Sequence, residues 1–582
     1  MTYPPQAEPE HLCVLKFGSS VLRVEDDYPA AALEIYRHVR DGEKVVAVVS
    51  ALGGETDALL DQAVRVGGAA PPALVARLAR VGELRSAALM ALALSRVGVQ
   101  ACTMDPHEMG LTARGAPLDA NLVGLDADAV LARLDACDVV VVPGFTAGHA
   151  DHGVVTLGRG GTDLSAVFFA ARLDAHRVRL IKDVDGVYAE DPARNPGAQR
   201  YSRMSYDEAA RASAGLIQPK AIHAAETEDV LIEVAAIGQD GATTIAHLPG
   251  RRSRPLPARR LRVALLGCGA VGAGVLALLQ ARADLFDLGP VLVRDPSRHQ
   301  GSALFTDRLG TALTGDPDIV VELIGGADYA GGIMRDALMG GASVVTANKG
   351  AVASHWDALH AAAAAGGGTL RFSAAVGGGA PVLEALGRRR GEVVAVDGVM
   401  NGTANFLLGK LGEGRAFDNA LAQAQALGFA EADPTADIDG HDAADKLSIL
   451  VREAFGAALP PGAIPKQSLR DIASADAREA LARGEVLKQV GRCRRASDGT
   501  VSASVRIESL PARHPLARPR DEENAFLISL ADGAAHGVFG KGAGRWPSAA
   551  SVFSDIMDVQ RMLMAAAPVA GAAAPMPLRM SA

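Results

Sequence analysis

The hydrophobic pattern between Leu12 and Leu248 alternates between two periods. Short Val-rich runs at 45–50, 138–142 and 178–182 are separated by longer segments in which Ala and Leu recur at helical spacing. Runs of this kind are typical of buried strands, and helices between such strands cover both faces of a largely parallel sheet. The first part of the chain is therefore predicted to be an α/β domain.

The pattern is interrupted at 249–260, where Pro and Arg dominate without any apolar period, as in an exposed linker. A second alternation of strands and helices covers 261–394. Beyond it, helical spacing at 437–455 and strand-like stretches at 501–508 and 525–530 indicate a smaller α+β unit. We therefore expect a second α/β domain followed by an α+β domain.

The two ends of the chain differ from these units. Residues 1–11 are polar and have no apolar core, so they are predicted to be an N-terminal extension and not a signal peptide. Residues 563–582 are mostly Ala, Pro and Met and are predicted to be a disordered tail. The predicted domain boundaries are 12–248, 261–394 and 395–562, with the linker at 249–260.

Composition narrows the class of protein. A chain of 582 residues exceeds the size at which a single core keeps growing, which agrees with several domains. A net charge of −9 argues against nucleic acid or an anionic membrane as partner, because binding phosphates requires clustered Lys and Arg. Apolar stretches fall short of the ~20 residues of a membrane span. The five cysteines are scattered without metal-site spacing, as expected for reduced thiols in the cytoplasm.

Four motifs in the first half combine glycines with charged residues. KFGSS at 16–20 closes the first predicted strand, and GELRS at 82–86 is predicted to open an Ala-rich helix. TLGRGGTD at 156–163 and KDVDGVY at 182–188 each follow a predicted strand. Backbone amides of such glycine turns can hold phosphate oxygens, while a nearby lysine neutralises transferring charge. The motifs together indicate phosphoryl transfer.

In this order the motifs resemble the aspartate kinase catalytic domain of the amino acid kinase fold, an α/β sandwich, over about residues 12–248. The resemblance implies L-aspartate and ATP with Mg²⁺ as substrates. It assigns catalysis to Lys16 and Asp163, and binding of the amino acid to Glu83 and Arg159. It assigns ATP binding to Lys16, Gly18, Ser19, Lys182, Asp183, Asp185, Tyr188 and Asp191.

The proposed chemistry suits these residue types. The β-carboxylate of aspartate is ionised at neutral pH, so its attack on the γ-phosphate needs no general base. The reaction does need positive charge, which Lys16, Arg159, Mg²⁺ and helix N-terminal amides would supply.

The first half departs from the family at two points. KFGSS is one residue shorter than the usual KFGGTS, which would weaken phosphate packing, and Lys182 stands where Thr is more usual. Lys182 either adds a cation beside ATP or is a solvated lysine at a strand end. The second interpretation of Lys182 is favoured.

In the second half, GCGAVG at 267–272 directly follows a predicted strand at 262–266. Gly267 and Gly269 allow a turn and close approach of a dinucleotide pyrophosphate, and Gly272 allows the helix and strand to pack closely. A second predicted strand at 291–293 ends in Arg294 and an aspartate. An acid there would bind the ribose hydroxyls of NAD, whereas Arg294 would pair with the extra phosphate of NADP, so NADP is favoured.

Five further motifs follow, VVTANK at 344–349, FSAAVGGGAP at 372–381, NGTANF at 401–406, LGFAEADP at 427–434 and DIDGHDAADK at 437–446. This series resembles homoserine dehydrogenase, over about residues 261–562. The resemblance implies a Rossmann-type doubly wound parallel sheet, an α+β catalytic and dimerisation domain, and NAD(P)H-dependent reduction of L-aspartate 4-semialdehyde to L-homoserine. It assigns cofactor binding to Gly267, Gly269, Ala270, Val271, Gly272, Arg294, Asn348, Lys349 and Gly544.

By the same resemblance, Lys349 and Lys446 bracket the substrate carbonyl and supply or polarise its proton, with Asp442 as the third catalytic residue. Glu431 and Asp437 are assigned to substrate binding. The spacing agrees, because residues 442 and 446 lie four apart on one helix face, and Lys349 follows a strand at the sheet edge where ligands bind.

Two features of fused enzymes of this type are altered. Val376 and Gly379 mark a candidate monovalent-cation site, but the family's glutamate is replaced by Ser373. The twelve residues between the halves cannot hold the paired ACT regulatory domains that such fusions commonly carry. We expect small-molecule substrates, no nucleic-acid or membrane partner, and a homodimer or higher homo-oligomer.

The leading hypothesis is a bifunctional aspartate kinase and homoserine dehydrogenase without ACT domains. In one alternative, motivated by the shortened KFGSS turn, the first half is a non-catalytic structural or oligomerisation module. In another, it phosphorylates a different carboxylate such as N-acetylglutamate, which Glu83 within GELRS disfavours.

Overall fold

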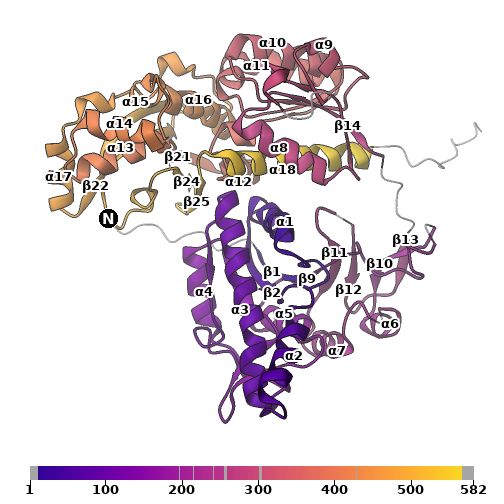
Figure 1. Ribbon diagram of the computed structural model, residues 1–582. Coiled ribbons are helices and arrows are strands. Elements are labelled where there is room, and N and C mark those ends of the chain that lie inside the picture. The colour runs from indigo at the N-terminus through magenta and orange to yellow at the C-terminus, as the bar shows by residue number, and fades with distance from the viewer. Residues whose placement is uncertain are drawn as a thin grey trace, which may run out of the picture.

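A computed structural model of the chain describes residues 11–195, 197–213, 215–239, 241–253, 259–299, 304–427 and 429–566. Figure 1 shows an N-terminal half, indigo to purple, beneath a C-terminal half, pink to yellow. The long helix α18 (Arg545–Ala566) lies between them. The described residues form four sheets.

The N-terminal half is built on a nine-stranded sheet of order β13-β10-β12-β11-β9-β1-β2-β6-β3. Its central strands, from β11 to β3, pair in parallel. A separate small sheet has the order β5-β4-β7-β8. The strands are β1 (His11–Phe17), β2 (Glu43–Val49), β3 (Ala101–Thr103), β4 (Thr112–Ala116), β5 (Asp119–Gly124), β6 (Val139–Pro143), β7 (Thr146–His149), β8 (Gly153–Thr156), β9 (Arg177–Lys182), β10 (Arg200–Met204), β11 (Ile232–Ala236), β12 (Ala242–Ile245) and β13 (Arg251–Ser253).

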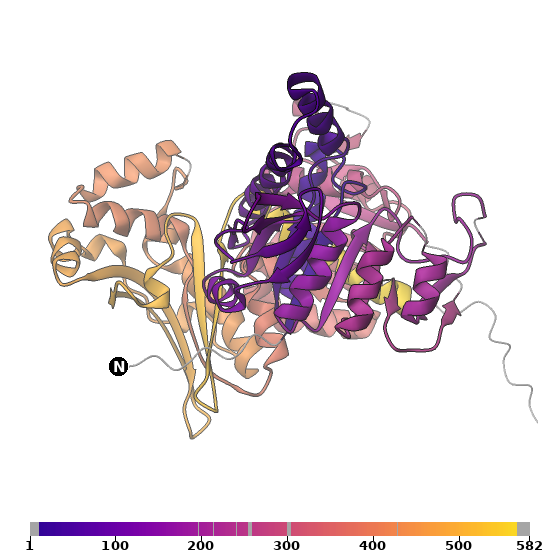
Figure 2. The same ribbon diagram turned by 90° about the horizontal axis from the view of Figure 1, so that it is seen from below.

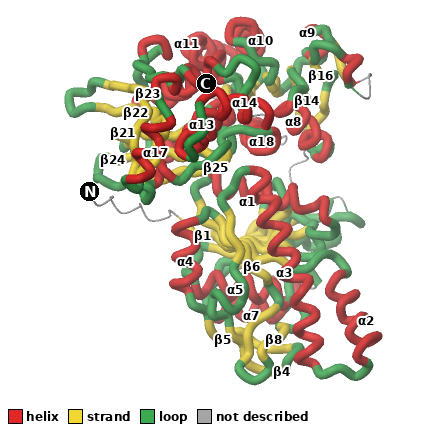
Figure 3. Tube along the Cα trace, turned by 60° about the vertical axis from the view of Figure 1, so that its left-hand side comes forward, coloured by secondary structure: helices red, strands yellow, loops and turns green. Residues whose placement is uncertain are grey.

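Helices cover both faces of the nine-stranded sheet (Figure 3). Successive strand side chains point to opposite faces, so Cys13, Leu15 and Phe17 join one buried cluster with α1 and α3, while Val14 joins another with α4, α5 and α7. This arrangement confirms the predicted α/β fold. The helices are α1 (Tyr28–Arg40), α2 (Glu55–Gly67), α3 (Pro72–Val97), α4 (Ala127–Ala136), α5 (Gly161–Arg172), α6 (Tyr206–Ala212) and α7 (Pro219–Thr227).

The C-terminal half begins with a parallel sheet of order β17-β16-β14-β18-β19-β20, with β15 also paired to β14. Helices α8 and α18 pack against one face of this sheet, and helices α10 and α11 pack against the other. The doubly wound sheet is therefore confirmed. Its elements are β14 (Leu261–Leu266), α8 (Ala270–Ala281), β15 (Phe286–Leu288), β16 (Val291–Leu292), β17 (Phe305–Thr306), α9 (Leu309–Ala312), β18 (Ile319–Glu322), α10 (Ala327–Met339), β19 (Ser343–Thr346), α11 (Lys349–Gly366) and β20 (Leu370–Arg371).

The last unit is a lobe built on an antiparallel sheet of order β23-β22-β21-β24-β25 (Figure 2). Helices α13, α16 and α17 pack against β22. Its elements are η4 (Ser373–Ala375), α12 (Val382–Arg388), β21 (Val393–Val399), α13 (Gly402–Gly412), α14 (Phe417–Leu427), α15 (Thr435–Ile438), α16 (His441–Phe455), α17 (Ser474–Ala482), β22 (Glu485–Arg495), β23 (Val501–Pro511), β24 (Glu523–Leu530) and β25 (Ala535–Lys541).

Four predicted boundaries were wrong. Part of the predicted linker forms β13, which pairs antiparallel with β10 and so belongs to the N-terminal sheet. Helix α18 continues to Ala566, since Leu563 packs against the core beneath it, and the rest of the predicted tail lies outside the described residues. The GELRS motif lies within α3 and does not open it. The helical stretch at 437–455 is broken at Gly440, whose φ of 76° is left-handed.

Candidate active sites

A cavity of about 840 Å³ lies at the carboxyl ends of β1 and β9, where open parallel sheets bind ligands. It brings together residues from all four motifs of the N-terminal half. Among its lining residues are Lys16, Gly18, Ser19, Glu83, Gly158, Arg159, Gly160, Gly161, Asp163, Lys182 and Asp183. The N-terminus of α5, at Gly161, lines the same cavity and can present backbone amides to an anion.

Two lysines share one carboxylate inside this cavity. Lys16 Nζ lies 2.6 Å from Asp163 Oδ1, and Lys182 Nζ lies 3.1 Å from Asp163 Oδ2. All three side chains are buried. Burial alone would raise the pKa of Asp163, but the charges of Lys16 and Lys182 hold it below its usual range. Burial, together with the charge of Lys16, lowers the pKa of Lys182 to about 8.

The favoured interpretation of Lys182 as a solvated strand-end residue was therefore wrong. Its side chain is 8% exposed, because β9 is an interior strand whose end faces the cavity. Gly18 has a matching role, since a side chain there would collide with the Lys16 ammonium. The glycine at position 18 thus leaves room for the ammonium group of Lys16.

Glu83 and Arg159, the residues assigned to binding the amino acid, line the same cavity but differ in burial. Glu83 is buried, and burial raises the pKa of its carboxyl group to about 8. Among the described residues, its Oε2 atom is a buried acceptor without a hydrogen-bond partner. Arg159 is exposed. An incoming ammonium group would satisfy Glu83 and favour its ionised form, while Arg159 offers a guanidinium for a carboxylate.

Three of the predicted nucleotide residues lie outside the set that lines the cavity. The Tyr188 hydroxyl donates to Asp185 Oδ1 at 2.6 Å, and Arg200 Nη1 donates to Asp185 Oδ2 at 2.5 Å. Asp191 is exposed and accepts a hydrogen bond from the backbone of Ala193. The assignment of Asp185, Tyr188 and Asp191 to ATP stays a prediction.

The glycine turn of the C-terminal half has the geometry of a dinucleotide site. Gly267 has a φ of 102°, and a side chain there would collide with the backbone of Leu323, just after the neighbouring strand β18. A side chain at Gly272 would collide with the carbonyl of Gly267. At Gly269 the space is open, and α8 begins directly after it at Ala270 and Val271 without a side-chain cap. These residues fit a pyrophosphate at the helix N-terminus.

A buried glutamate supports the neighbouring part of this site and was missed from the sequence. Glu322, at the end of β18, accepts the Thr346 hydroxyl at 2.6 Å and the backbone N–H of Ile324 at 2.8 Å. Thr346 in turn accepts the backbone N–H of Asn348, whose side chain caps α11. The sequence signal that could have identified Glu322 is an acidic residue at the end of the otherwise apolar run IVVE. This chain of hydrogen bonds fixes the start of α11, where Lys349 lies.

The three predicted catalytic residues of the C-terminal half meet at one carboxylate. Lys349 Nζ lies 3.0 Å from Asp442 Oδ1, and Lys446 Nζ lies 2.8 Å from Asp442 Oδ2. Burial opposes ionisation of Asp442, but Lys446 and Lys349 hold its pKa well below its usual range. The charge of Asp442 raises the pKa of Lys349. The cluster therefore presents two ammonium groups oriented by one buried anion.

Asn401, within the NGTANF motif, is a further member that sequence reasoning gave no role. Its amide donates to Asp442 Oδ2 at 2.9 Å and to Asp437 Oδ1 at 2.7 Å. Lys446 also donates to the carbonyl of Met400 at 2.7 Å. Asp437 therefore joins the cluster through Asn401. Glu431 is exposed and lies outside these contacts, so its assignment to the substrate stays a prediction.

The remaining predicted cofactor residues lie around the same sheet. Arg294 is exposed just beyond β16. Asp295 beside it accepts the backbone N–H and hydroxyl of Ser297, at 3.1 and 2.6 Å. Gly544 lies between β25 and α18 with a φ of 121°.

The segment of the candidate monovalent-cation site lies beside contacts with Arg40 and α18. Val376 is buried, and the backbone of Gly379 bonds to the carbonyl of Lys541. Ser373 donates its hydroxyl to Asp555 at 2.8 Å and accepts from Arg40 at 3.2 Å. Arg40 and Asp555 therefore contact the residue that replaces the family's glutamate, and the cation site at Val376 and Gly379 stays a prediction.

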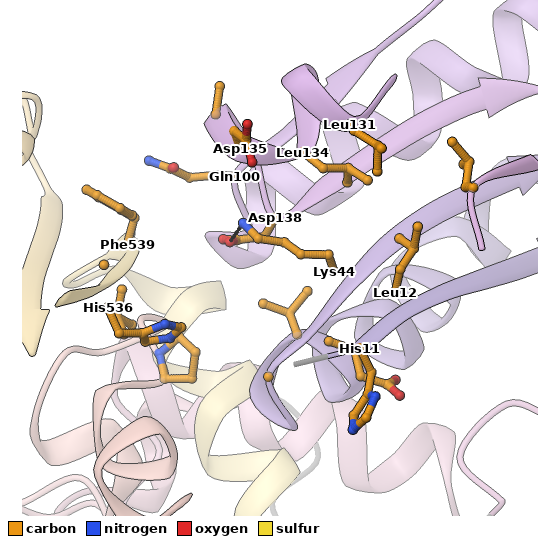
Figure 4. Close-up of a pocket in the computed structure, with 18 of the residues that line it drawn as sticks. His11, Leu12, Lys44, Gln100, Leu131, Leu134, Asp135, Asp138, His536 and Phe539 are labelled. Carbon is orange, nitrogen blue, oxygen red and sulfur yellow. Dashed lines mark hydrogen bonds and ion pairs between the residues drawn. The ribbon is translucent and has the colours of Figure 1, made fainter. Parts of the chain in front are cut away.

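A further cavity of about 580 Å³ lies between the two halves (Figure 4), and no residue of the Asp163 or Asp442 cluster is among the residues that line it. His11, Lys44 and Asp138 line it from the amino-terminal edge of the first sheet, and His536 and Phe539 line it from β25. Lys44 is paired with Asp138 at 3.1 Å. This cavity lies at the sheet edge opposite to the one that carries Lys16 and Asp163.

Comparison with known proteins accounts for both halves. The model of the amino acid kinase family matches residues 11–235. The models of the homoserine dehydrogenase NAD-binding domain and of homoserine dehydrogenase match residues 267–373 and 381–557. Homoserine dehydrogenase of Corynebacterium glutamicum is 36% identical over 337 residues, which are 55% of this chain and 76% of that protein.

The chain belongs to the homoserine dehydrogenase family. The corresponding enzyme of Pseudomonas aeruginosa is 35% identical over 52% of this chain and 73% of its own length. A solved homoserine dehydrogenase from Thiobacillus denitrificans is 35% identical, with a TM-score of 0.50 over 53% of this chain and 75% of that chain.

The predicted union of two enzymes in one chain is thereby confirmed. The N-terminal half is an amino acid kinase domain, and the C-terminal half is a homoserine dehydrogenase with a domain for a nicotinamide cofactor. Small-molecule substrates fit both. Within the described residues, no helix is both long and apolar enough to span a bilayer.

Proposed function

We propose that the chain phosphorylates L-aspartate with ATP and Mg²⁺ and separately reduces L-aspartate 4-semialdehyde to L-homoserine, preferably with NADPH. The observation that carries the proposal is the presence of two separate clusters, each built on a buried carboxylate between two lysines. Asp163 holds Lys16 and Lys182 in the kinase domain, and Asp442 holds Lys349 and Lys446 in the dehydrogenase.

In the kinase domain, Lys16 and Lys182 supply fixed positive charge where the phosphoryl group transfers, and Asp163 keeps both ammonium groups oriented. Glu83 and Arg159 bind the ammonium and carboxylate groups of aspartate. Its ionised β-carboxylate then attacks without a general base. Gly18, Ser19 and the N-terminus of α5 bind the phosphates, with Mg²⁺ neutralising further charge.

In the dehydrogenase, the nicotinamide cofactor supplies the hydride. Lys349 and Lys446 polarise the aldehyde oxygen and provide the proton that the new hydroxyl group takes. Asp442 and Asn401 fix the positions of the two ammonium groups, while Asp437 and Glu431 contact the substrate. In the direction of homoserine oxidation the same lysines receive that proton.

The alternative of a non-catalytic first half predicts a protein that never turns over ATP. Its motivation was the shortened KFGSS turn, yet that turn lines an open cavity in which Lys16 and Asp163 are paired. The second alternative, another carboxylate acceptor, is disfavoured by Glu83 Oε2, which has no hydrogen-bond partner among the described residues and suits a free ammonium.

One assay tests the proposal against both alternatives. The full chain is offered ATP with a panel of amino acids and N-acetyl amino acids, and acyl phosphate is trapped as the hydroxamate. We expect product from aspartate alone. Product from an N-acetylated acid would reassign the substrate, and no product from any acceptor would establish the structural-module hypothesis.

Cofactor preference gives a separate prediction. Replacing Arg294 by Ser is expected to raise the KM for NADPH by about tenfold or more, the worth of one charge-assisted hydrogen bond, and to leave the KM for NADH nearly unchanged. Steady-state kinetics with both cofactors measure this. Arg298→Ser is the matched control, since Arg298 lies in the same turn but is paired with Asp295 at 3.2 Å. Equal effects on both cofactors would contradict the assignment.

A further inference from the structure

A heavily buried polar contact between the two halves is centred on Arg40, the last residue of α1 in the kinase domain. Its side chain is only 4% exposed. Arg40 Nη2 lies 2.5 Å from Glu384 Oε1 on α12 and 2.6 Å from Asp555 Oδ1 on α18. The same nitrogen donates to Ser373 Oγ at 3.2 Å. One kinase side chain therefore joins three separate segments of the dehydrogenase.

Asp555 and the neighbouring carboxylates require the Arg40 guanidinium as their counterion. Asp555 is fully buried, and burial raises the pKa of its carboxyl group to about 6 even though the charge of Arg40 opposes the shift. Glu384 and Asp558, on the same side of the interface, repel the charge of Asp555 further. Removing Arg40 would leave the buried Asp555 facing the partly exposed Glu384 and Asp558 without their counterion.

The contact reaches the reaction centre through Ser373. Both the backbone N–H and the hydroxyl group of Ser373 donate to Asp555, at 2.9 and 2.8 Å. Ser373 begins η4, which leads into Val376 and the glycine loop, residues 377–379. Val376 and Ala375 belong to one buried cluster with Val352 and Ala443. Val352 lies about one helical turn after Lys349 on α11, and Ala443 directly follows Asp442 on α16. A displacement of η4 would therefore alter the packing of α11, which carries Lys349, and of α16, which carries Asp442.

A second contact supports the same loop from the kinase side. A Cβ atom at Gly379 would lie 3.1 Å from the carbonyl oxygen of Val97, the last residue of α3. A Cβ atom at Gly98 would lie 3.2 Å from Lys541, whose carbonyl accepts the N–H of Gly379. The end of α3 in the kinase domain thus packs directly against the glycine loop.

We propose that Arg40 of the kinase domain is a positioning residue for the dehydrogenase reaction, holding Ser373, Glu384 and Asp555 together so that η4 and the glycine loop support Lys349 and Asp442. The kinase domain then completes the dehydrogenase as part of its scaffold. This inference rests on the proposed dehydrogenase activity.

The test uses the full chain with Arg40→Ala and Arg40→Lys. For Arg40→Ala we expect kcat of homoserine oxidation to fall by about tenfold to 100-fold, the cost of misplacing catalytic groups, with a smaller change in KM. Aspartate-dependent ATP turnover should be unchanged, because Arg40 is not among the residues lining the ATP cavity. Arg40→Lys should recover part of the loss.

Chemical rescue distinguishes a positioning role of Arg40 from a role that is limited to docking the two halves. Millimolar guanidinium chloride, compared with the same concentration of potassium chloride, should restore much of kcat in Arg40→Ala. Arg96→Ala is the matched control, because Arg96 stacks on Trp546 of α18 at 4.1 Å across the same interface without touching Ser373. This control should keep the wild-type rate.

Three outcomes would overturn the inference. They are a wild-type kcat in Arg40→Ala, an equal loss in Arg96→Ala, and a loss shared with ATP turnover that guanidinium does not restore. A wild-type chain without homoserine oxidation would instead refute the proposed function, so the two failures are distinguishable.

Discussion

Replacing Lys16 by Ala is expected to abolish formation of aspartyl phosphate, with a loss of at least about 1000-fold, as for other groups that place a cation on a transferring phosphoryl group. Lys16 Nζ is held 2.6 Å from Asp163 in the cavity, so removing it leaves Asp163 as an unbalanced negative charge beside ATP. Hydroxamate trapping of the acyl phosphate measures the effect.

The control for this prediction lies on the same sheet. Lys44, on β2, is paired with Asp138 at the opposite edge, so Lys44→Ala should keep kinase activity. Homoserine oxidation should be unchanged in both variants. Kinase turnover in Lys16→Ala within tenfold of the wild type would refute the assignment of Lys16.

Lys182 adds a pH dependence to the kinase. With a pKa of about 8, its ammonium group is charged below that pH and becomes neutral above it. If its charge stabilises the transition state, kcat/KM for ATP should decline as pH rises through about 8, since this parameter reports the free enzyme. Lys182→Arg, which stays charged, should lose that alkaline decline. A decline that persists in Lys182→Arg would show that another group controls it.

The second large effect is expected at Asp442. Asp442→Asn and Lys446→Ala should each lower kcat of homoserine oxidation by at least about 100-fold, the typical contribution of positioned proton-transfer groups. Asp442 holds both catalytic lysines, at 3.0 and 2.8 Å, so its neutral replacement releases them together. Spectrophotometric assay of NADPH formation measures the loss.

The pH profile distinguishes Asp442 from a purely structural residue. Its charge raises the pKa of Lys349, and a lysine that receives the proton in homoserine oxidation must be neutral. Asp442→Asn should therefore shift the rise of the residual oxidation rate with pH to lower pH. Lys410→Ala removes a partly exposed lysine paired with Glu413 at 2.8 Å and should keep the wild-type rate and profile. Unchanged kcat in Asp442→Asn, or loss of ATP turnover alongside it, would count against the assignment.

The sequence by itself determined the two enzyme types, the α/β architecture of both halves and most members of each cluster. These features have local signatures. Glycine turns follow strands, and the four-residue spacing of Asp442 and Lys446 places them on one face of α16. Sequence motifs of this kind place each residue at a known end of a strand or helix.

Tertiary structure decided what those residues contact. Lys182 looked like a solvated strand end, but the interior position of β9 buries it against Asp163. Asn401 and Glu322 had no assigned role until folding brought them to Asp442 and Thr346. Burial and contacts between distant segments leave no periodic signal along the chain.

The same reason applies most strongly to Arg40. In the sequence it is one of many arginines near the end of a helix, and nothing within its own domain marks it. Its partners Ser373 and Asp555 lie in the other half of the chain. Only the docking of the two halves excludes water from these charges, and that exclusion turns an ordinary surface arginine into a buried counterion.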